Sequence, residues 1–136
     1  MRAQSVSSPL RARAWHAAIA ACHARARTGE GTDWKRIATL YEELARIAPS
    51  PVVDLNRAVA IAMAFGPALG LELVDALATE PSLKTYHLLP SVRGDLLVKL
   101  GRSGEARGEF ERAASLTRNE RERKLLLGRA AKCARA

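Results

Sequence analysis

Apolar residues return every three or four positions along most of this chain. Between residues 33 and 48, for example, Ile37, Leu40 and Leu44 fall on one face of a helix. Helix start and stop signals separate this segment from similar segments that follow it. The pattern predicts helices over about 9–27, 33–48, 51–65, 67–79, 82–100, 103–117 and 120–134. A proline, Pro90, leaves open whether the fifth helix is continuous, is interrupted, or begins near Pro90, since proline is tolerated in a first helical turn.

Short polar segments set the expected limits of these helices. Ser50 followed by Pro51 is a typical capping residue with proline in the first helical turn. Gly66 and Gly101 are expected to end helices, because glycine adopts the left-handed conformation without a Cβ clash. Asn119 is the expected cap of the last helix.

The composition indicates one helical domain. A chain of 136 residues with 48% hydrophobic residues can bury a core. Only 4% of its residues are aromatic, and a core of alanine and leucine favours closely packed helices over a sheet. We therefore expect an all-α protein. The first eight residues have no apolar period, so residues 1–8 are expected to be disordered and residues 9–136 to form the domain.

Residues 93–116 are the most informative stretch, because they read as two antiparallel helices joined by a tight turn. Small residues stand where two helix backbones must approach, and the bulky Phe110 stands among them. The positions that define this hairpin are Gly94, Leu97, Gly101, Ala106, Phe110 and Ala113. A single hairpin cannot bury its apolar faces alone, so we expect neighbouring hairpins to stack.

The spacing of these positions resembles a tetratricopeptide repeat. In that family a small residue is followed by a large one, a turn glycine, an alanine, an aromatic residue and a second alanine. Gly66 and Gly101 lie 35 residues apart, close to the family's period of about 34. Pro90 departs from the pattern, which usually has a large residue there. The resemblance implies a tetratricopeptide-like right-handed superhelix of about three helical hairpins plus a C-terminal capping helix.

Three longer runs, residues 17–26, 48–77 and 86–102, narrow the resemblance. They are similar to the C-terminal extension of those bacterial extracytoplasmic-function (ECF) RNA polymerase sigma factors that carry a tetratricopeptide-like domain. The resemblance implies a regulatory domain that contacts the sigma factor domains, RNA polymerase or an unknown regulator, and so controls transcription initiation.

The core-binding domain and the promoter-reading helix-turn-helix of such a factor are absent from this chain, and residues 1–14 do not resemble the family. Sigma activity is therefore not expected of the chain itself. A truncated gene, a mis-assigned start and a free-standing descendant are the open explanations.

The net charge of +8 is carried by the two ends of the chain. Residues 1–36 hold seven Lys and Arg against two acids, residues 117–136 also hold seven against two, and residues 37–116 hold eight against ten. Basic ends can bind nucleic acid weakly through phosphate contacts. The alternative is that these arginines are solvated helix faces in a protein from a GC-rich genome. The candidate nucleic-acid contacts are Arg11, Arg13, Arg25, Arg27, Arg118, Arg121 and Arg123.

Several polar residues interrupt the apolar stripes of the third and fifth predicted helices. A charge in such a position must be paired or must face a groove. One interpretation is a protein-binding groove on the concave side, formed by the first helix of each hairpin. The alternative is an internal network in which Asp95 or Asp54 neutralises an arginine and joins neighbouring hairpins. The groove candidates are Asn56, Arg57, Ser91, Arg93, Asp95 and Lys99.

No residue pattern indicates catalysis, a metal site or a cofactor. His16, His23 and His87 lack partners at ligand spacing, because His23 and the adjacent Cys22 point about 100° apart on a helix. The sequence contains no glycine-rich phosphate loop and no nucleophile elbow. We therefore expect a protein that is not an enzyme, with no cofactor.

The compartment follows from the cysteines and the hydropathy. Cys22 and Cys133 are far apart and are read as reduced, buried residues of a cytoplasmic protein. No run of about 20 apolar residues exists, so no membrane contact is expected. The functions left open are a protein-interaction module, a nucleic-acid-contacting accessory domain, a free-standing tetratricopeptide adaptor and a small-molecule sensor.

Overall fold

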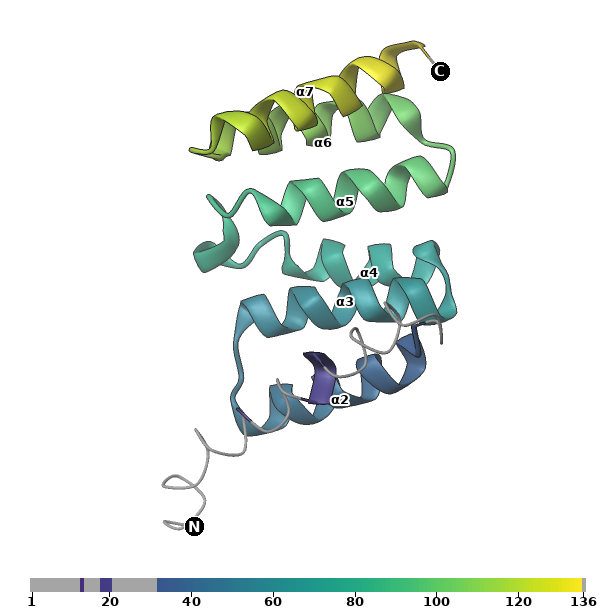
Figure 1. The fold of residues 1–136 in the computed structure, drawn as a ribbon, viewed down its shortest axis with the longest axis vertical. Helices are drawn as coiled ribbons and strands as arrows, with labels where there is room; N and C mark the ends of the chain where they lie inside the picture. Colours follow the sequence, from purple (N-terminus) through teal and green to yellow (C-terminus); the bar gives the residue numbers. More distant parts are fainter. Residues whose placement is uncertain (1–12, 14–17, 21–31, 136) are drawn as a thin grey trace.

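The computed structural model describes residues 13, 18–20 and 32–135, and in this part of the chain it contains helices and no strand. Arg13 and residues 18–20 are helical. The remaining elements, shown in Figure 1, are α2 (Trp34–Ile47), α3 (Pro51–Phe65), α4 (Pro67–Leu77), the short 3-10 helix η2 (Pro81–Leu83), α5 (Leu88–Lys99), α6 (Ser103–Leu116) and α7 (Glu120–Arg135). The all-α expectation is confirmed for the described residues.

The expected helix limits are confirmed at most ends. The Ser50 hydroxyl accepts from the Val52 amide at 3.2 Å, and the Asn119 side chain accepts from the Glu122 amide at 3.0 Å. Gly66 and Gly101 both have positive φ, 116° and 77°, which side-chain-bearing residues rarely adopt. These two glycines therefore make the tight turns between α3 and α4 and between α5 and α6.

The start of the fifth helix expected at residue 82 is wrong, and the alternative start near Pro90 agrees with the structure. The Glu80 carboxylate accepts from the Ser82 amide, and Pro81–Leu83 closes into a single 3-10 turn that places Leu83 in the core. The chain then turns, and α5 begins at Leu88. Pro90 consequently lies in the first turn of α5, where its missing N–H leaves no hydrogen bond unmade.

Most of the first predicted helix, 9–27, and the N-terminus expected to be disordered lie outside the described residues. Ile19 is described, and it is buried against α2 and α3.

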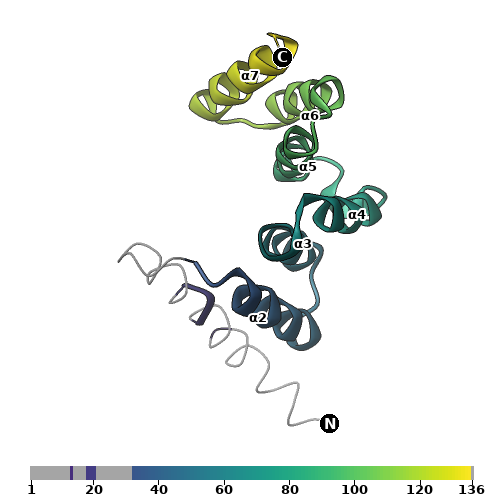
Figure 2. The same cartoon turned by 90° about the vertical axis from the view of Figure 1, so that its right-hand side faces the viewer.

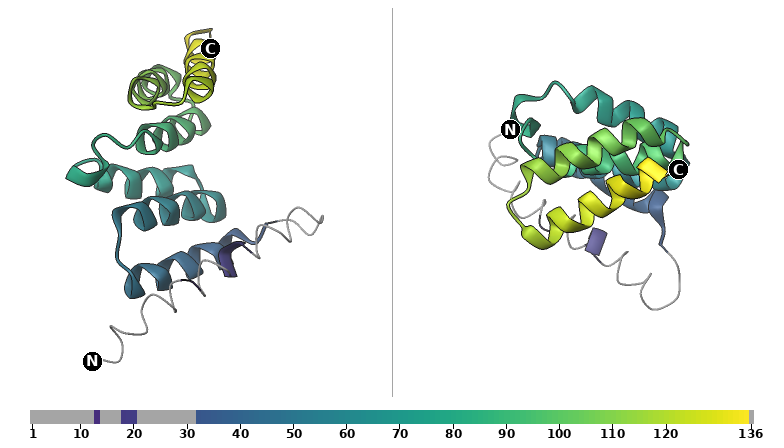
Figure 3. Two further views of the ribbon diagram at one scale, coloured as in Figure 1. Left: turned by 60° about the vertical axis from the view of Figure 1, so that its left-hand side comes forward. Right: turned by 90° about the horizontal axis from the view of Figure 1, so that it is seen from above.

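The helices stack one after another in chain order, each antiparallel to the one before it (Figure 1). Figure 2 looks nearly along the helix axes and shows a zigzag, with α3, α5 and α7 toward one side and α4 and α6 toward the other. In agreement with this arrangement, α3 contacts α5 directly, across α4. Both views in Figure 3 show α7 lying alongside α6 at one end of the stack.

Two apolar clusters hold the stack together, and α3 contributes to both. Val53 and Ala60 of α3 pack against α2, whereas Leu55, Ala58 and Ala62 pack toward α4. A helix that is buried on two sides needs apolar residues around most of its circumference. The second cluster continues without interruption through α4, α5, α6 and α7.

A very close helix contact joins α5 to α6 through Gly94 and Phe110. A Cβ atom added at Gly94 would lie 2.7 Å from the Phe110 ring, and Phe110 is itself fully buried. A similar approach joins α4 to α3, where a Cβ at Gly70 would lie 2.4 Å from the Ala62 Cβ. Only glycine permits these two backbone separations.

We predict that Gly94→Ala lowers the free energy of unfolding by about 1–3 kcal/mol, because the added methyl overlaps the buried Phe110 ring, which must shift to make room. Gly108→Ala is the matched control in an exposed part of α6, where an added Cβ meets no atom within 4 Å. This control should stabilise the protein by about 0.5–1 kcal/mol through helix propensity. Urea unfolding followed by circular dichroism measures both changes.

A second variant tests whether steric overlap with the Phe110 ring is the cause of the expected destabilisation by Gly94→Ala. Phe110→Leu removes the ring, so Gly94→Ala should cost less in the Phe110→Leu background than in the wild type. Equal costs in the two backgrounds would show that Gly94 and Phe110 are not in tight contact.

Candidate functional site

The side of the stack that carries α3, α5 and α7 is the first candidate site, and we call it the inner face. Two contacts define it. The Lys99 ammonium of α5 lies 3.4 Å from the Met63 sulfur of α3. Asp95 of α5 forms an ion pair with Arg129 of α7. These contacts place Asp95 and Lys99 toward α3 and α7, away from the buried interface that α5 shares with α6.

Exposed apolar side chains lie on the inner face beside these charges. Val52 and Met63 of α3 are 38% and 44% exposed, and Leu88 of α5 is 37% exposed. At about 100° per residue, Val52 lies within about 20° of Met63 around α3, and Leu88 lies within about 20° of both Asp95 and Lys99 around α5. The inner face therefore combines accessible apolar surface with charges of both signs.

A groove between α5 and α7 extends the inner face. It encloses about 270 Å³, and its lining includes Val98, Phe110 and Cys133. The Arg129 guanidinium lies over the Phe110 ring at 4.5 Å from the centroid, a cation–π distance. Because Arg129 also pairs with Asp95, both of its interactions fix the position of α7 relative to α5 and α6.

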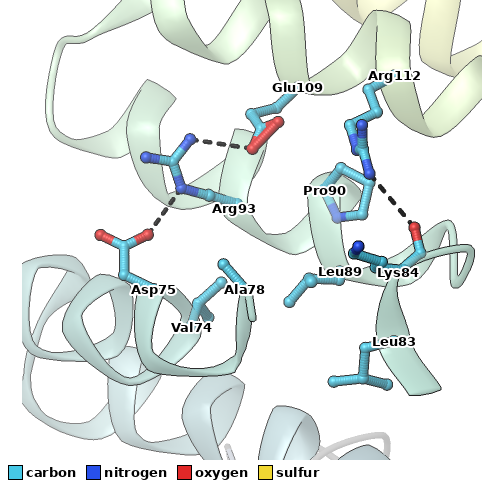
Figure 4. A pocket seen from close by; sticks show the side chains of 10 residues that line it. All are labelled: Val74, Asp75, Ala78, Leu83, Lys84, Leu89, Pro90, Arg93, Glu109 and Arg112. Atoms are coloured by element: carbon cyan, nitrogen blue, oxygen red, sulfur yellow. Dashed lines mark hydrogen bonds and ion pairs between the residues drawn. The ribbon is translucent and has the colours of Figure 1, made fainter. Parts of the chain in front are cut away.

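A second pocket lies between α4, η2, α5 and α6, and it is centred on Arg93. Figure 4 shows the Arg93 guanidinium between two carboxylates that come from different helices. Its Nε donates to Asp75 of α4 at 2.8 Å, and one terminal nitrogen donates to Glu109 of α6 at 2.9 Å. The hydrogen bond to Asp75, followed by the weaker contribution of Glu109, raises the pKa of Arg93 above its usual value.

The floor of this pocket is apolar, and its rim is charged. The pocket measures about 390 Å³. Across it from Arg93, the Arg112 guanidinium donates to the Lys84 carbonyl at 3.3 Å, which ties α6 to the segment after η2 (Figure 4). The apolar side chains that line it are Val74, Ala78, Leu83, Leu89 and Pro90. Since the guanidinium that dominates the pocket already has two carboxylate partners, its main effect is to hold three helices together.

The structure divides the six predicted groove residues. Asp95 and Lys99 lie on the inner face, and Asn56 and Ser91 share helix faces with Met63 and Asp95. Arg93 lies on the other side of α5, where it joins α4 to α6. This placement fits the alternative of an internal network, although the acids are Asp75 and Glu109 instead of Asp95 or Asp54.

Arg57 is placed differently from the other five. It follows Val53 by one helical turn on the side of α3 that packs against α2. Its Nε is buried and has no hydrogen-bond partner among the described residues.

The predicted nucleic-acid contacts are also divided. Arg11, Arg25 and Arg27 lie outside the described residues, and Arg13, Arg118 and Arg121 are exposed. Arg123 points inward, where it donates to the Ala114 carbonyl at 3.2 Å and to the Thr117 carbonyl at 2.7 Å. Arg123 is therefore a cap for the end of α6.

The sequence analysis missed the partners of these charges and the groove floored by Phe110. Asp75 lies 18 residues and Glu109 lies 16 residues from Arg93 along the chain, so no local pattern connects them. His87 lies 2.8 Å from Glu122 of α7, which also accepts from the buried Thr117. Over the described residues, no group of three or more His, Cys, Asp or Glu side chains is placed to hold a metal ion.

Comparison with known proteins gives one informative match. A stretch of 106 residues is 49% identical to an uncharacterized protein of Rhizobium meliloti (strain 1021). The match covers 78% of this chain and 25% of that protein, so the chain spans about a quarter of its relative's length. No family model matches the sequence. Within the described residues, no helix combines the length and the apolar character needed to cross a membrane.

We predict that Arg93→Met lowers the free energy of unfolding by about 1–3 kcal/mol, because two carboxylates lose the charge between them in a partly buried site. The matched control is Arg107→Met, which breaks an exposed pair with Glu111 within α6 and should cost less than about 1 kcal/mol. Chemical denaturation at pH 7 measures both.

A double-mutant cycle of Arg93→Met with Glu109→Gln tests the pairing itself. The two changes should cost less together than the sum of the single changes, by about 0.5–3 kcal/mol. Simple additivity would show that Arg93 and Glu109 do not form a stabilising ion pair between α5 and α6.

Proposed function

We propose that this chain is a non-catalytic, tetratricopeptide-like interaction module of an ECF-type sigma factor, which regulates transcription initiation in the bacterial cytoplasm. Its inner face would bind a segment of the sigma factor domains or of RNA polymerase. The observation that carries the proposal is the inner face, where two adjacent helices expose apolar side chains beside Asp95 and Lys99.

The helical stack supports the tetratricopeptide-like part of the proposal. The chain forms antiparallel hairpins with turn glycines at Gly66 and Gly101, and the expected aromatic position, Phe110, packs on the expected small one, Gly94. The direct contact of α3 with α5 brings together the first helices of neighbouring hairpins. In helical repeat proteins these helices line the concave surface that binds partners.

The relative from Rhizobium meliloti supports the modular part of the proposal. The region that it shares with this chain makes up a quarter of its length. A domain that recurs inside a longer protein is expected to act on neighbouring domains or on their partners. The sigma-factor context itself comes from the resemblance of residues 17–26, 48–77 and 86–102.

Binding at the inner face requires no chemistry. An amphipathic helix or an extended segment would cover Val52, Met63 and Leu88 with its own apolar side chains. Asp95 and Lys99 would set its orientation, because charges at an interface contribute more to specificity than to affinity. The adjoining groove between α5 and α7 would receive one further apolar side chain, which Val98 and Phe110 would contact.

We predict that the double variant Met63→Ser/Leu88→Ser weakens binding about tenfold or more, because truncating central apolar contacts of an interface costs about 1–2 kcal/mol each. The immobilised chain is titrated with bacterial RNA polymerase core enzyme and, separately, with the two sigma domains of an ECF factor that carries such an extension. Surface plasmon resonance gives the dissociation constants.

The matched control is Leu69→Ser/Leu127→Ser, which removes equally exposed leucines from α4 and α7 away from the inner face. It should leave affinity within about twofold. Absence of binding to the polymerase and to the sigma domains would refute the sigma-factor context and favour a free-standing adaptor. Equal losses in both double variants would refute the assignment of the inner face.

A further inference from the structure

The outward side of α7 carries a row of positive charges. Arg121, Lys124, Lys132 and Arg135 are all exposed, and Gly128 lies in the middle of the row. At about 100° per residue these positions fall within a sector of about 80° around the helix. The buried residues of α7, Leu126 and Ala130, point to the opposite side, toward α6. The row therefore lies on the side of α7 that faces away from α6, and Lys132 at its C-terminal part also lines the groove between α5 and α7. Figure 1 shows α7 at one end of the stack.

The cations of α7 that point inward and those that point outward differ in whether they have partners. The inward cations have partners, because Arg123 caps α6 and pairs with Glu120, while Arg129 pairs with Asp95. The other acid, Glu122, is held by Thr117 and His87. In contrast, none of the four outward cations forms an ion pair within the described part of the chain. No acidic side chain is left on α7 to neutralise the row.

The N-terminal part of the row is unfavourable for the helix that carries it, whereas Lys132 and Arg135 in the last turn complement the helix dipole. Like charges three or four residues apart, such as Arg121 and Lys124, destabilise a helix by about 0.2–0.5 kcal/mol per pair. Glycine at the centre, Gly128, costs about a further 1 kcal/mol relative to alanine. A surface that contacts only solvent does not require charges of a single sign. On the exposed side of α6, for example, Arg107 pairs with Glu111. A local conflict of this kind is expected where a surface serves binding.

We infer that the outward row of α7 binds the phosphate backbone of nucleic acid, without reading its sequence. The row extends over about 21 Å of helix, a length along which duplex DNA presents about twelve phosphate charges. Nothing lies within 4 Å of a Cβ added at Gly128, so the middle of the row is open to a strand.

The chemistry of the row favours nucleic acid over an acidic protein. Two cations lie at each end of the row around Gly128, and the exposed Leu125 and Leu127 flank this glycine. Protein interfaces are depleted of lysine, however, and the row itself contains no acid. Interfaces with DNA are more polar and more positively charged. The row adjoins the inner face only at Lys132, and the residues tested for the proposed function, Met63 and Leu88, are not part of it. The two proposals are therefore tested by different variants.

The test is fluorescence anisotropy of a labelled 20-base-pair duplex of arbitrary sequence, titrated with the full chain at 25–200 mM NaCl. Each phosphate contact contributes about −0.9 to the slope of log K against log salt concentration. Replacing all four cations, as R121Q/K124Q/K132Q/R135Q, should reduce the magnitude of that slope by about 3–4 and weaken binding about tenfold or more at 50 mM NaCl. The double variant K124Q/K132Q should reduce the slope about half as much.

The matched control, K84Q/R102Q/R107Q/R112Q, removes the same total charge from positions outside α7. It should change the slope by less than about 1. Circular dichroism shows whether each variant is folded. If the quadruple variant of α7 does not fold, the double variant K124Q/K132Q still tests the inference. Absence of DNA binding by the wild type at 25 mM NaCl, or equal losses in both quadruple variants, would overturn the inference. Binding of poly-L-glutamate through the row without binding of DNA would also overturn it, in favour of an acidic protein partner.

Discussion

The close approach of α5 and α6 at Gly94 and Phe110 is the constraint on which the rest of the structure depends. The Phe110 ring occupies the space that a Cβ at position 94 would need, and it is buried among residues of the larger apolar cluster. Arg129 of α7 packs over the same ring. The Phe110 side chain therefore fixes the spacing between α5 and α6 and the position of α7, the helix that follows them. Packing of this kind is sensitive to a single methyl group, because protein interiors have few voids.

Ion pairs between helices add further links to those made by this packing. Arg93 joins α4 to α6 through α5, and Asp95 joins α5 to α7 on the opposite side. Each pair links residues that are well separated along the chain. The pairs of Arg93 join neighbouring helices, whereas the pair of Asp95 with Arg129 joins α5 to α7 past α6. Because these charges are partly buried, their pairing contributes to one specific arrangement of the hairpins. The ion pairs confined to one helix, such as Arg107 with Glu111, have no such consequence.

The same packing leaves two surfaces of different chemistry available to partners. The inner face offers apolar side chains between charges of both signs, which suits a folded or folding segment of protein. The outward side of α7 offers positive charge alone, which suits a phosphate backbone. A module with both surfaces could hold a protein partner and remain close to nucleic acid. The chain spans about a quarter of the length of the relative that shares its sequence.

The sequence by itself determined the helices, their turns and the hairpin contact. Gly66, Gly101 and Asn119 act within a few residues of themselves, and the spacing of Gly94 and Phe110 reports on a contact between consecutive helices. A start of α5 near Pro90 is one of the alternatives that the sequence leaves open. The structure decides for it, because the Glu80 carboxylate and Pro81 favour a local 3-10 turn over continued helix. Only the tertiary structure decided which acids neutralise Arg93, that Arg123 caps a helix, and which cations of α7 remain unpaired. Those outcomes depend on contacts between side chains of different helices. The separation of two residues along the chain does not indicate whether their side chains come into contact.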